Sequence, residues 1–193
     1  MLTLFHAPRS RSTRMIWLLE ELGAPYAIRP VSIVRQGGIG ARDPDNPHPH
    51  GQVPALVDDG VLITESAAIA LYLTDSYRDN PIGPAVGDPQ RGPYLTWLAY
   101  YAGVLEPVIG AYFRDGMTDA EKAAYEILDG QLKGALEGGS WLLGDTFSAA
   151  DILFISLLQF ARQALPPHAV YDRWLERAQA RPAFARALEK DDV

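Results

Sequence analysis

Residues 51–73 read GQVPALVDDGVLITESAAIALYL, and this stretch predicts a β-hairpin followed by a helix. Two short apolar runs, 53–57 and 61–63, flank the sequence DDG at 58–60. An Asp-Gly pair suits turns whose backbone needs positive φ, so we expect the two runs to pair as antiparallel strands. The helix is expected to begin at position 65, directly after the second strand.

The residues before this hairpin alternate between strand and helix patterns. Residues 2–5 and 26–33 are strand candidates, while residues 12–22 carry a wide apolar face at helical spacing. Gly23 stands where a glycine commonly ends a helix. Residues 35–52 are rich in Gly, Pro, His and Asp and are expected to form a long loop. The order βαβ, loop, ββα indicates an α/β sandwich rather than a doubly wound sheet.

The pattern changes near residue 80. Residues 79–90 hold three prolines and two glycines, a composition typical of a linker. From residue 91 onward, apolar residues recur at helical spacing and no convincing strand follows. We therefore expect an α/β domain at residues 1–78, a linker at 79–90 and an all-helical bundle domain at 91–193.

The helical half contains several start and stop signals. A first helix over 91–113 is expected to kink or end at Pro107. Capping-box patterns predict helix starts at Thr118 and at Ser148, and Asp151 is the residue that completes the second pattern. The run 152–160 is nearly all apolar, which predicts a helix buried on every side. The remaining helices are expected at 171–180 and 183–190.

The composition restricts the chemistry. The chain has no cysteine, which excludes disulfides, thiolate metal sites and cysteine nucleophiles. The net charge of −7 lies mainly after residue 78, and an acidic half argues against a nucleic-acid partner. The sequence contains neither an apolar run long enough for a membrane span nor a signal-peptide pattern, so we expect a soluble, cytoplasmic protein.

The segment PRSRSTR at 8–14 places two hydroxyls at the start of the first predicted helix. On one interpretation, Ser10 or Ser12 is simply the residue that caps this helix. On the other, one serine caps the helix while the second faces a bound anion, which the free N–H groups and partial positive charge of a helix N-terminus would stabilise.

The segment 51–66 offers a second set of polar groups. Val53 precedes Pro54 at a strand start, where a cis bond and an exposed backbone edge could pair with an extended peptide. Ser66 and its neighbouring N–H groups could hold a carboxylate, and Glu65 could accept from an ammonium group. The simpler interpretation of Glu65 and Ser66 is an ordinary capping pair. His48 and His50 lack a third ligand, so no metal site is expected.

Together these segments resemble the glutathione transferase family. Residues 10–26 (SRSTRMIWLLEELGAPY) look like the first strand–helix unit of its serine-type bacterial and fungal branch. Residues 51–73 resemble the family's most recognisable stretch, and residues 144–154 (GDTFSAADILF) resemble the capping box of its helical domain. The resemblance implies a thioredoxin-like first domain, glutathione as co-substrate, a homodimer and a role in detoxification.

The resemblance also implies roles for single residues. The backbone of Val53, before a cis Pro54, would pair with the cysteinyl part of glutathione. Glu65 and Ser66 would hold its γ-glutamyl end, and Gln52 stands where many relatives have a lysine near the glycyl carboxylate. Ser10 aligns with the catalytic serine and Ser12 is its rival. His6 occupies the end of the first strand, which speaks against the tyrosine-type classes.

The implied reaction is activation of the glutathione thiol as a thiolate, which then attacks a small hydrophobic electrophile. The hydroxyl of Ser10 and the helix N-terminus would both favour the charged form. The electrophile would sit between the domains, against aromatic side chains that could equally be core residues: Tyr94, Trp97, Tyr101 and Phe113. The alternatives are a non-catalytic interaction or regulatory module of the same fold, and glutathione-dependent reduction, isomerisation or dehalogenation.

Overall fold

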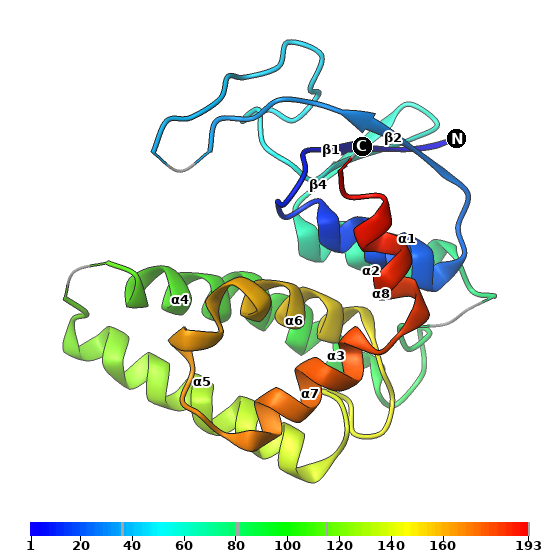
Figure 1. The fold of residues 1–193 in the computed structure, drawn as a ribbon. Coiled ribbons are helices and arrows are strands. Elements are labelled where there is room, and N and C mark those ends of the chain that lie inside the picture. Colours follow the sequence, from blue (N-terminus) through cyan, green and yellow to red (C-terminus); the bar gives the residue numbers. More distant parts are fainter. Residues whose placement is uncertain (36, 80–81, 115, 193) are drawn as a thin grey trace. The chain divides into compact units, whose positions relative to one another are not determined.

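The computed structural model describes residues 1–35, 37–79, 82–114 and 116–192, and it separates into two compact units (Figure 1). The first unit contains the described residues of Met1–Pro81 together with those of Arg181–Val193. The second unit spans Ile82–Ala180. The expected linker at 79–90 includes residues 80 and 81, which lie outside the described residues. Ile82 already belongs to the second unit, where its carbonyl accepts a hydrogen bond from the Ala149 N–H at 2.8 Å.

The first unit is built on a four-stranded mixed sheet in the order β2-β1-β3-β4. Strand β1 (Leu2–His6) runs parallel to β2 (Tyr26–Pro30) and antiparallel to β3 (Ala55–Asp58). Strand β4 (Val61–Thr64) pairs antiparallel with β3 at the sheet edge. The expected βαβ–ββα order is confirmed, although β2 ends at Pro30 rather than at residue 33.

Helix α1 (Thr13–Leu22) forms as its apolar spacing predicts. Its buried side chains include Met15, Ile16 and Leu19, and Gly23 ends the helix in the left-handed region at φ 64°. Helix α2 (Ser66–Ser76) follows β4, and its buried face includes Ile69 and Leu73. The β3–β4 turn at Asp59 and Gly60 has positive φ at both residues, as the hairpin prediction required.

Helix α8 (Pro182–Glu189) is the main departure from the expected division of the chain. The helical domain was expected to continue to residue 193, whereas α8 packs against α1 and clusters with the first unit. The Arg181 guanidinium donates two hydrogen bonds to the Glu21 carboxylate, at 2.6 and 2.8 Å. Glu21 also accepts from the Trp17 indole at 3.0 Å, so one carboxylate anchors the start of α8 to α1.

Replacing Arg181 with alanine is expected to lower the free energy of unfolding of the first unit by about 1.5–3 kcal/mol, because it leaves the Glu21 carboxylate without its guanidinium. Urea denaturation measures the change. Lys122→Ala is the control, because Lys122 Nζ lies 3.2 Å from Asp119 on the surface and such pairs contribute about 0–1 kcal/mol. Equal effects of the two substitutions would contradict the anchoring role of Arg181.

The second unit is helical. It contains α3 (Arg91–Tyr100), a π-helical turn at Tyr101–Leu105, α4 (Glu106–Tyr112), α5 (Asp119–Gly138), α6 (Ala149–Ala161), a 3-10 turn at Arg162–Ala164 and α7 (Ala169–Gln179). The expected capping boxes are present at Thr118 with Glu121 and at Ser148 with Asp151.

Two helix predictions need correction. The helix expected over 91–113 is interrupted by the π-helical turn, in which the Glu106 N–H reaches back to the Tyr101 carbonyl. The interruption lies just before Pro107, whose missing N–H and bulky ring disturb the regular ladder one turn earlier. The run 152–160 is not buried on every side, because Phe160 at the end of α6 is 62% exposed.

Candidate functional site

The sheet register brings three segments to one end of the first unit. Phe5 lies opposite Ala55 in the β1–β3 pair, and Ala55 lies opposite Thr64 in the β3–β4 pair. The loop after β1, the residues before β3 and the residues after β4 therefore lie at the same end of the sheet. They belong to the two segments, 8–14 and 51–66, that the sequence singled out.

Ser12 occupies the N-cap position of α1, but its hydroxyl does not cap the helix. The side chain is fully buried, and its Oγ lies 2.8 Å from His6 Nδ1 and accepts from the Ala7 N–H at 3.2 Å. The capping interpretation therefore places Ser12 correctly at the N-cap position. It is wrong about the hydroxyl, which turns into the core and makes no capping hydrogen bond to the helix. A ligand at the surface of the loop has no direct access to this oxygen.

Ser10 lies next to Ser12 and nearer to the surface of the loop. Its Oγ is 2.8 Å from Ser12 Oγ and accepts from the Ser12 N–H at 3.2 Å. Its side chain is half-buried. Of the two serines, Ser10 is the one whose hydroxyl reaches both the buried network and the outside.

The end of the chain braces this loop. The Asp191 carbonyl lies 2.9 Å from His6 Nε2, and its carboxylate accepts from the Arg9 N–H at 3.0 Å and from the Thr13 hydroxyl. Arg9 has a positive φ of 52°, a conformation that a non-glycine residue holds only when its surroundings fix it. Arg35 adds a further brace by donating to the Pro8 carbonyl at 2.7 Å.

His6 and Asp191 were not among the predicted site residues. A histidine at the end of a buried strand, six residues before a serine, was the available signal for His6. The sequence carried no signal for Asp191, because 185 positions separate it from its histidine partner. Only the packing of α8 on α1 brings the two together.

The segment before β3 has the expected backbone. The Val53–Pro54 peptide bond is cis, and Val53 is buried in a small apolar cluster with Ala7 and Val31. Because Ala7 belongs to the serine loop, this cluster holds the two segments against each other. Gln52 is exposed, and its carbonyl accepts from the Asn46 amide at 3.0 Å.

Glu65 and Ser66 stand at the start of α2. Glu65 precedes the helix with φ 68° and ψ 121°, which is an unusual conformation for a residue with a side chain. Its side chain is exposed, whereas Ser66 is buried, and Glu65 makes no side-chain cap to the helix. Strained backbone of this kind concentrates at ligand-binding positions, so it supports a binding role more than an ordinary capping pair.

His48 lies in the loop that precedes Gln52. Burial lowers the pKa of His48, while the nearby Glu65 carboxylate acts in the opposite direction. Its Nδ1 accepts a hydrogen bond from the His50 N–H at 3.1 Å, so the ring stabilises the loop. Among the described residues, no group of three or more His, Asp or Glu side chains is placed to hold a metal ion.

The aromatic candidates of the second unit divide by burial. Tyr94 and Tyr101 are fully buried and serve the core, and Phe113 at the end of α4 is 54% exposed. Trp97 is half-buried and packs edge-on against Phe154 with 5.4 Å between ring centroids. Trp97 and Tyr101 meet on Phe154, while Phe113 instead contacts Tyr112.

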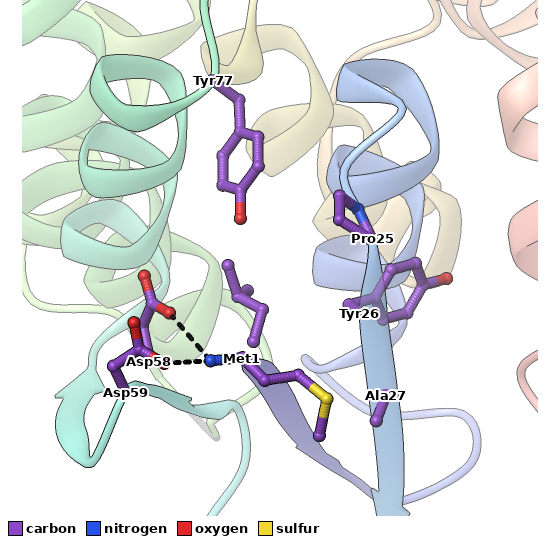
Figure 2. Close-up of a pocket in the computed structure, with 8 residues that line it drawn as sticks. Met1, Pro25, Tyr26, Ala27, Asp58, Asp59 and Tyr77 are labelled. Carbon is purple, nitrogen blue, oxygen red and sulfur yellow. Dashed lines mark hydrogen bonds and ion pairs between the residues drawn. The ribbon is translucent and has the colours of Figure 1, made fainter.

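A cavity of about 480 Å³ lies at the opposite end of β1 (Figure 2). The Met1 amino group forms ion pairs there with Asp58 and Asp59. Burial and these carboxylates raise the pKa of Tyr77, whose hydroxyl points into the cavity. Because the whole length of β1 separates it from the serine loop, this cavity is distinct from the predicted site. Its lining comprises Met1, Leu2, Pro25, Tyr26, Ala27, Asp58, Asp59 and Tyr77.

Comparison with known proteins gives consistent matches. The model of the glutathione S-transferase N-terminal domain matches residues 4–81, and that of the C-terminal domain matches residues 111–190. The chain is 31% identical over 163 residues to glutathione S-transferase GstA of Escherichia coli O157:H7, covering 82% of this chain and 81% of that protein.

Two further relatives bear on the chemistry. Disulfide-bond oxidoreductase YfcG of Escherichia coli K12 is 27% identical, with 98% of this chain and 95% of that protein covered. A sphingomonad glutathione S-transferase solved with glutathione superposes with a TM-score of 0.78 at 28% identity, covering 99% of each chain. The fold and the sequence thus lead to the same group of proteins.

Proposed function

Because the chain belongs to the glutathione S-transferase family, we propose that it binds glutathione and activates the thiol as a thiolate that attacks a small hydrophobic electrophile. The single observation that supports the proposal is the sheet register, which puts the loop after β1, the residues before β3 and the start of α2 at the same end of the sheet. The serine-type branch of the family is part of the proposal.

Ser10 is the group we assign to the sulfur. Its half-buried hydroxyl is open to a ligand, while Ser12 is enclosed by His6 and Ala7. Lowering a thiol pKa by ~2 units corresponds to roughly 2.7 kcal/mol of preferential stabilisation of the thiolate. A hydrogen bond to a charged group contributes about 1.5–3 kcal/mol, so one hydroxyl accounts for most of that shift.

The remaining groups hold the tripeptide. The backbone of Val53 is assigned to the cysteinyl residue, because Val53 lies just before β3, where an extended peptide could pair with it. Glu65 and Ser66 are assigned to the ammonium and carboxylate of the γ-glutamyl end, and the N-terminus of α2 favours the carboxylate. Gln52, exposed beside Val53, is assigned to the glycyl carboxylate.

Aromatic side chains of the second unit are the candidates for contact with the electrophile. Trp97 is the strongest of the four aromatic candidates, since Tyr94 and Tyr101 are core residues and Phe113 stands apart. No helix among the described residues is both long and apolar enough to cross a membrane. A cytoplasmic homodimer that serves detoxification, with no nucleic-acid or membrane partner, completes the proposal.

The test has two steps. Calorimetric titration with glutathione is expected to give binding at or below millimolar concentration, and a small aromatic electrophile is then expected to be conjugated. Absence of binding at millimolar glutathione would sink every glutathione-dependent version of the function. Binding without any turnover would favour the non-catalytic interaction or regulatory module.

A second candidate function is glutathione-dependent reduction of disulfides, which the similarity to YfcG favours. The same activated thiolate would attack a sulfur instead of a carbon, and isomerisation or dehalogenation would use it likewise. Parallel assays with a disulfide and with an aromatic halide separate these reactions. A higher kcat/KM on the disulfide than on the halide would mean that reduction, and not transfer, is the main activity.

Replacing Ser66 with alanine is expected to weaken glutathione binding about tenfold. The substitution removes a hydroxyl assigned to the γ-glutamyl carboxylate, and a hydrogen bond to a charged group contributes about 1.5–3 kcal/mol. Titration calorimetry of the wild type and the variant measures the dissociation constants. Ser76→Ala at the other end of α2 is the matched control, because its side chain is exposed. Unchanged affinity in the Ser66 variant would contradict the assignment.

A further inference from the structure

The hydroxyls of the serine loop form a continuous chain that ends on a buried histidine. Ser10 Oγ lies 2.8 Å from Ser12 Oγ, which lies 2.8 Å from His6 Nδ1. His6 is fully buried, and its Nε2 lies 2.9 Å from the Asp191 carbonyl. Only the outer end of this chain, at Ser10, is open to a ligand.

The direction of each hydrogen bond follows from what each atom can do. A carbonyl oxygen only accepts, so His6 Nε2 must carry a hydrogen, and in neutral His6 the Nδ1 atom is then an acceptor. Ser12 therefore donates its single hydroxyl hydrogen to Nδ1. Its oxygen accepts from the Ala7 N–H and from the Ser10 hydroxyl.

This orientation has a consequence for Ser10. Its hydrogen is directed inward to Ser12, and its oxygen accepts from the Ser12 N–H at 3.2 Å. The remaining lone pair faces outward. With neutral His6, Ser10 is thus an acceptor toward a ligand, which suits a thiol and not a thiolate.

Protonation of His6 reverses the chain. An imidazolium donates from Nδ1 to Ser12, Ser12 then donates to Ser10, and the Ser10 hydrogen is directed outward. Ser10 becomes a donor, as a thiolate requires. The Asp191 Oδ1 atom lies 3.6 Å from His6 Nε2, within ion-pair distance of an imidazolium.

We propose that His6 receives the thiol proton of glutathione through Ser12 and Ser10, with Asp191 holding the histidine in the required orientation. This relay rests on the proposed function. Ser10 Oγ takes the proton from sulfur, Ser10 passes its own hydrogen to Ser12, and Ser12 passes its own to His6 Nδ1. The electron pair of the broken S–H bond stays on sulfur. After the product leaves, the proton returns along the chain to water at Ser10.

His6→Asn tests the relay with little change of shape. The asparagine oxygen can accept from Ser12 as Nδ1 does, but it cannot take up a proton at neutral pH. The ultraviolet absorbance of the thiolate, measured against pH with glutathione bound, is expected to show a thiol pKa about one unit higher than in the wild type. At neutral pH kcat/KM should fall about tenfold, since the rate follows the thiolate fraction, and it should recover at high pH.

Ser12→Ala breaks the chain of hydroxyls while His6 itself is kept. It carries the test alone if the histidine variant fails to fold. It should produce the same pKa shift, and the double variant should be no worse than either single one, because both interrupt one path. His168→Asn in the second unit is the matched control and should leave the pH profile unchanged.

Three outcomes would overturn the relay. A wild-type pH profile in His6→Asn means that His6 does not take the proton. Additive losses in the double variant mean that the two residues act independently. Failure of the wild type to bind glutathione removes the proposed function and the relay together, whereas the first two outcomes leave the proposed function standing.

Discussion

Replacing Ser10 with alanine is expected to lower kcat/KM for glutathione conjugation about 100-fold while leaving the affinity for glutathione nearly unchanged. The hydroxyl is assigned to the sulfur, and its contribution appears only when negative charge develops there. Removing a single hydrogen-bond donor from a developing anion typically costs about 10²–10³ in rate. Most of the binding contacts are assigned to Val53, Glu65 and Ser66, which the substitution does not touch.

Steady-state kinetics together with titration calorimetry separate the two effects. The loss should exceed that of Ser12→Ala, because Ser12 lies behind Ser10 in the buried network. Ser76→Ala, which removes an exposed hydroxyl from the end of α2, is the control and should behave as the wild type. A larger loss in Ser12→Ala than in Ser10→Ala would reverse the assignment of the two serines.

Replacing Asp151 with alanine is expected to cost about 3–5 kcal/mol of the free energy of unfolding of the second unit, because each buried donor left without an acceptor costs about 1–3 kcal/mol. The carboxylate is fully buried and accepts from the Leu142 N–H at 2.9 Å, the Trp174 indole at 3.1 Å, and the Ser148 N–H and hydroxyl. Alanine leaves these buried donors without their acceptor. Urea denaturation followed by tryptophan fluorescence measures the loss. Asp145→Ala, an exposed neighbour, should change stability by less than about 0.5 kcal/mol.

The same carboxyl predicts a pH dependence. Burial raises the pKa of Asp151 to about 6, against the opposing hydrogen bonds from Leu142, Ser148 and Trp174. The folded state then holds the proton more tightly than the unfolded state, so this contribution favours folding at low pH and is lost as the pH rises through about 6. The stability difference between the wild type and Asp151→Ala should be about 1 kcal/mol larger at pH 5 than at pH 7. A difference that does not change with pH would contradict the raised pKa.

Local signals were enough for most of the fold. The Asp59–Gly60 turn, the Gly23 helix end and both capping boxes depend on residues within a few positions of one another, so the sequence predicts them directly. The position of Glu65 before α2 also follows from adjacent residues, whereas the cis Val53–Pro54 bond was implied by the resemblance to the family. The interrupted helix before Pro107 was only partly predicted, because a proline signals a disturbance without specifying a π-helical turn.

The amino-acid sequence by itself predicted which residues to test for glutathione binding, because the segments that contain Ser10, Val53 and Ser66 resemble those of the glutathione transferase family. Only the tertiary structure decided how the two serines differ. It turned Ser12 inward onto His6, left Ser10 half-buried, and brought Asp191 back to the first strand. The physical reason is distance along the chain: hydrogen bonds between neighbouring residues follow local patterns, whereas a contact across 185 positions exists only because α8 packs on α1.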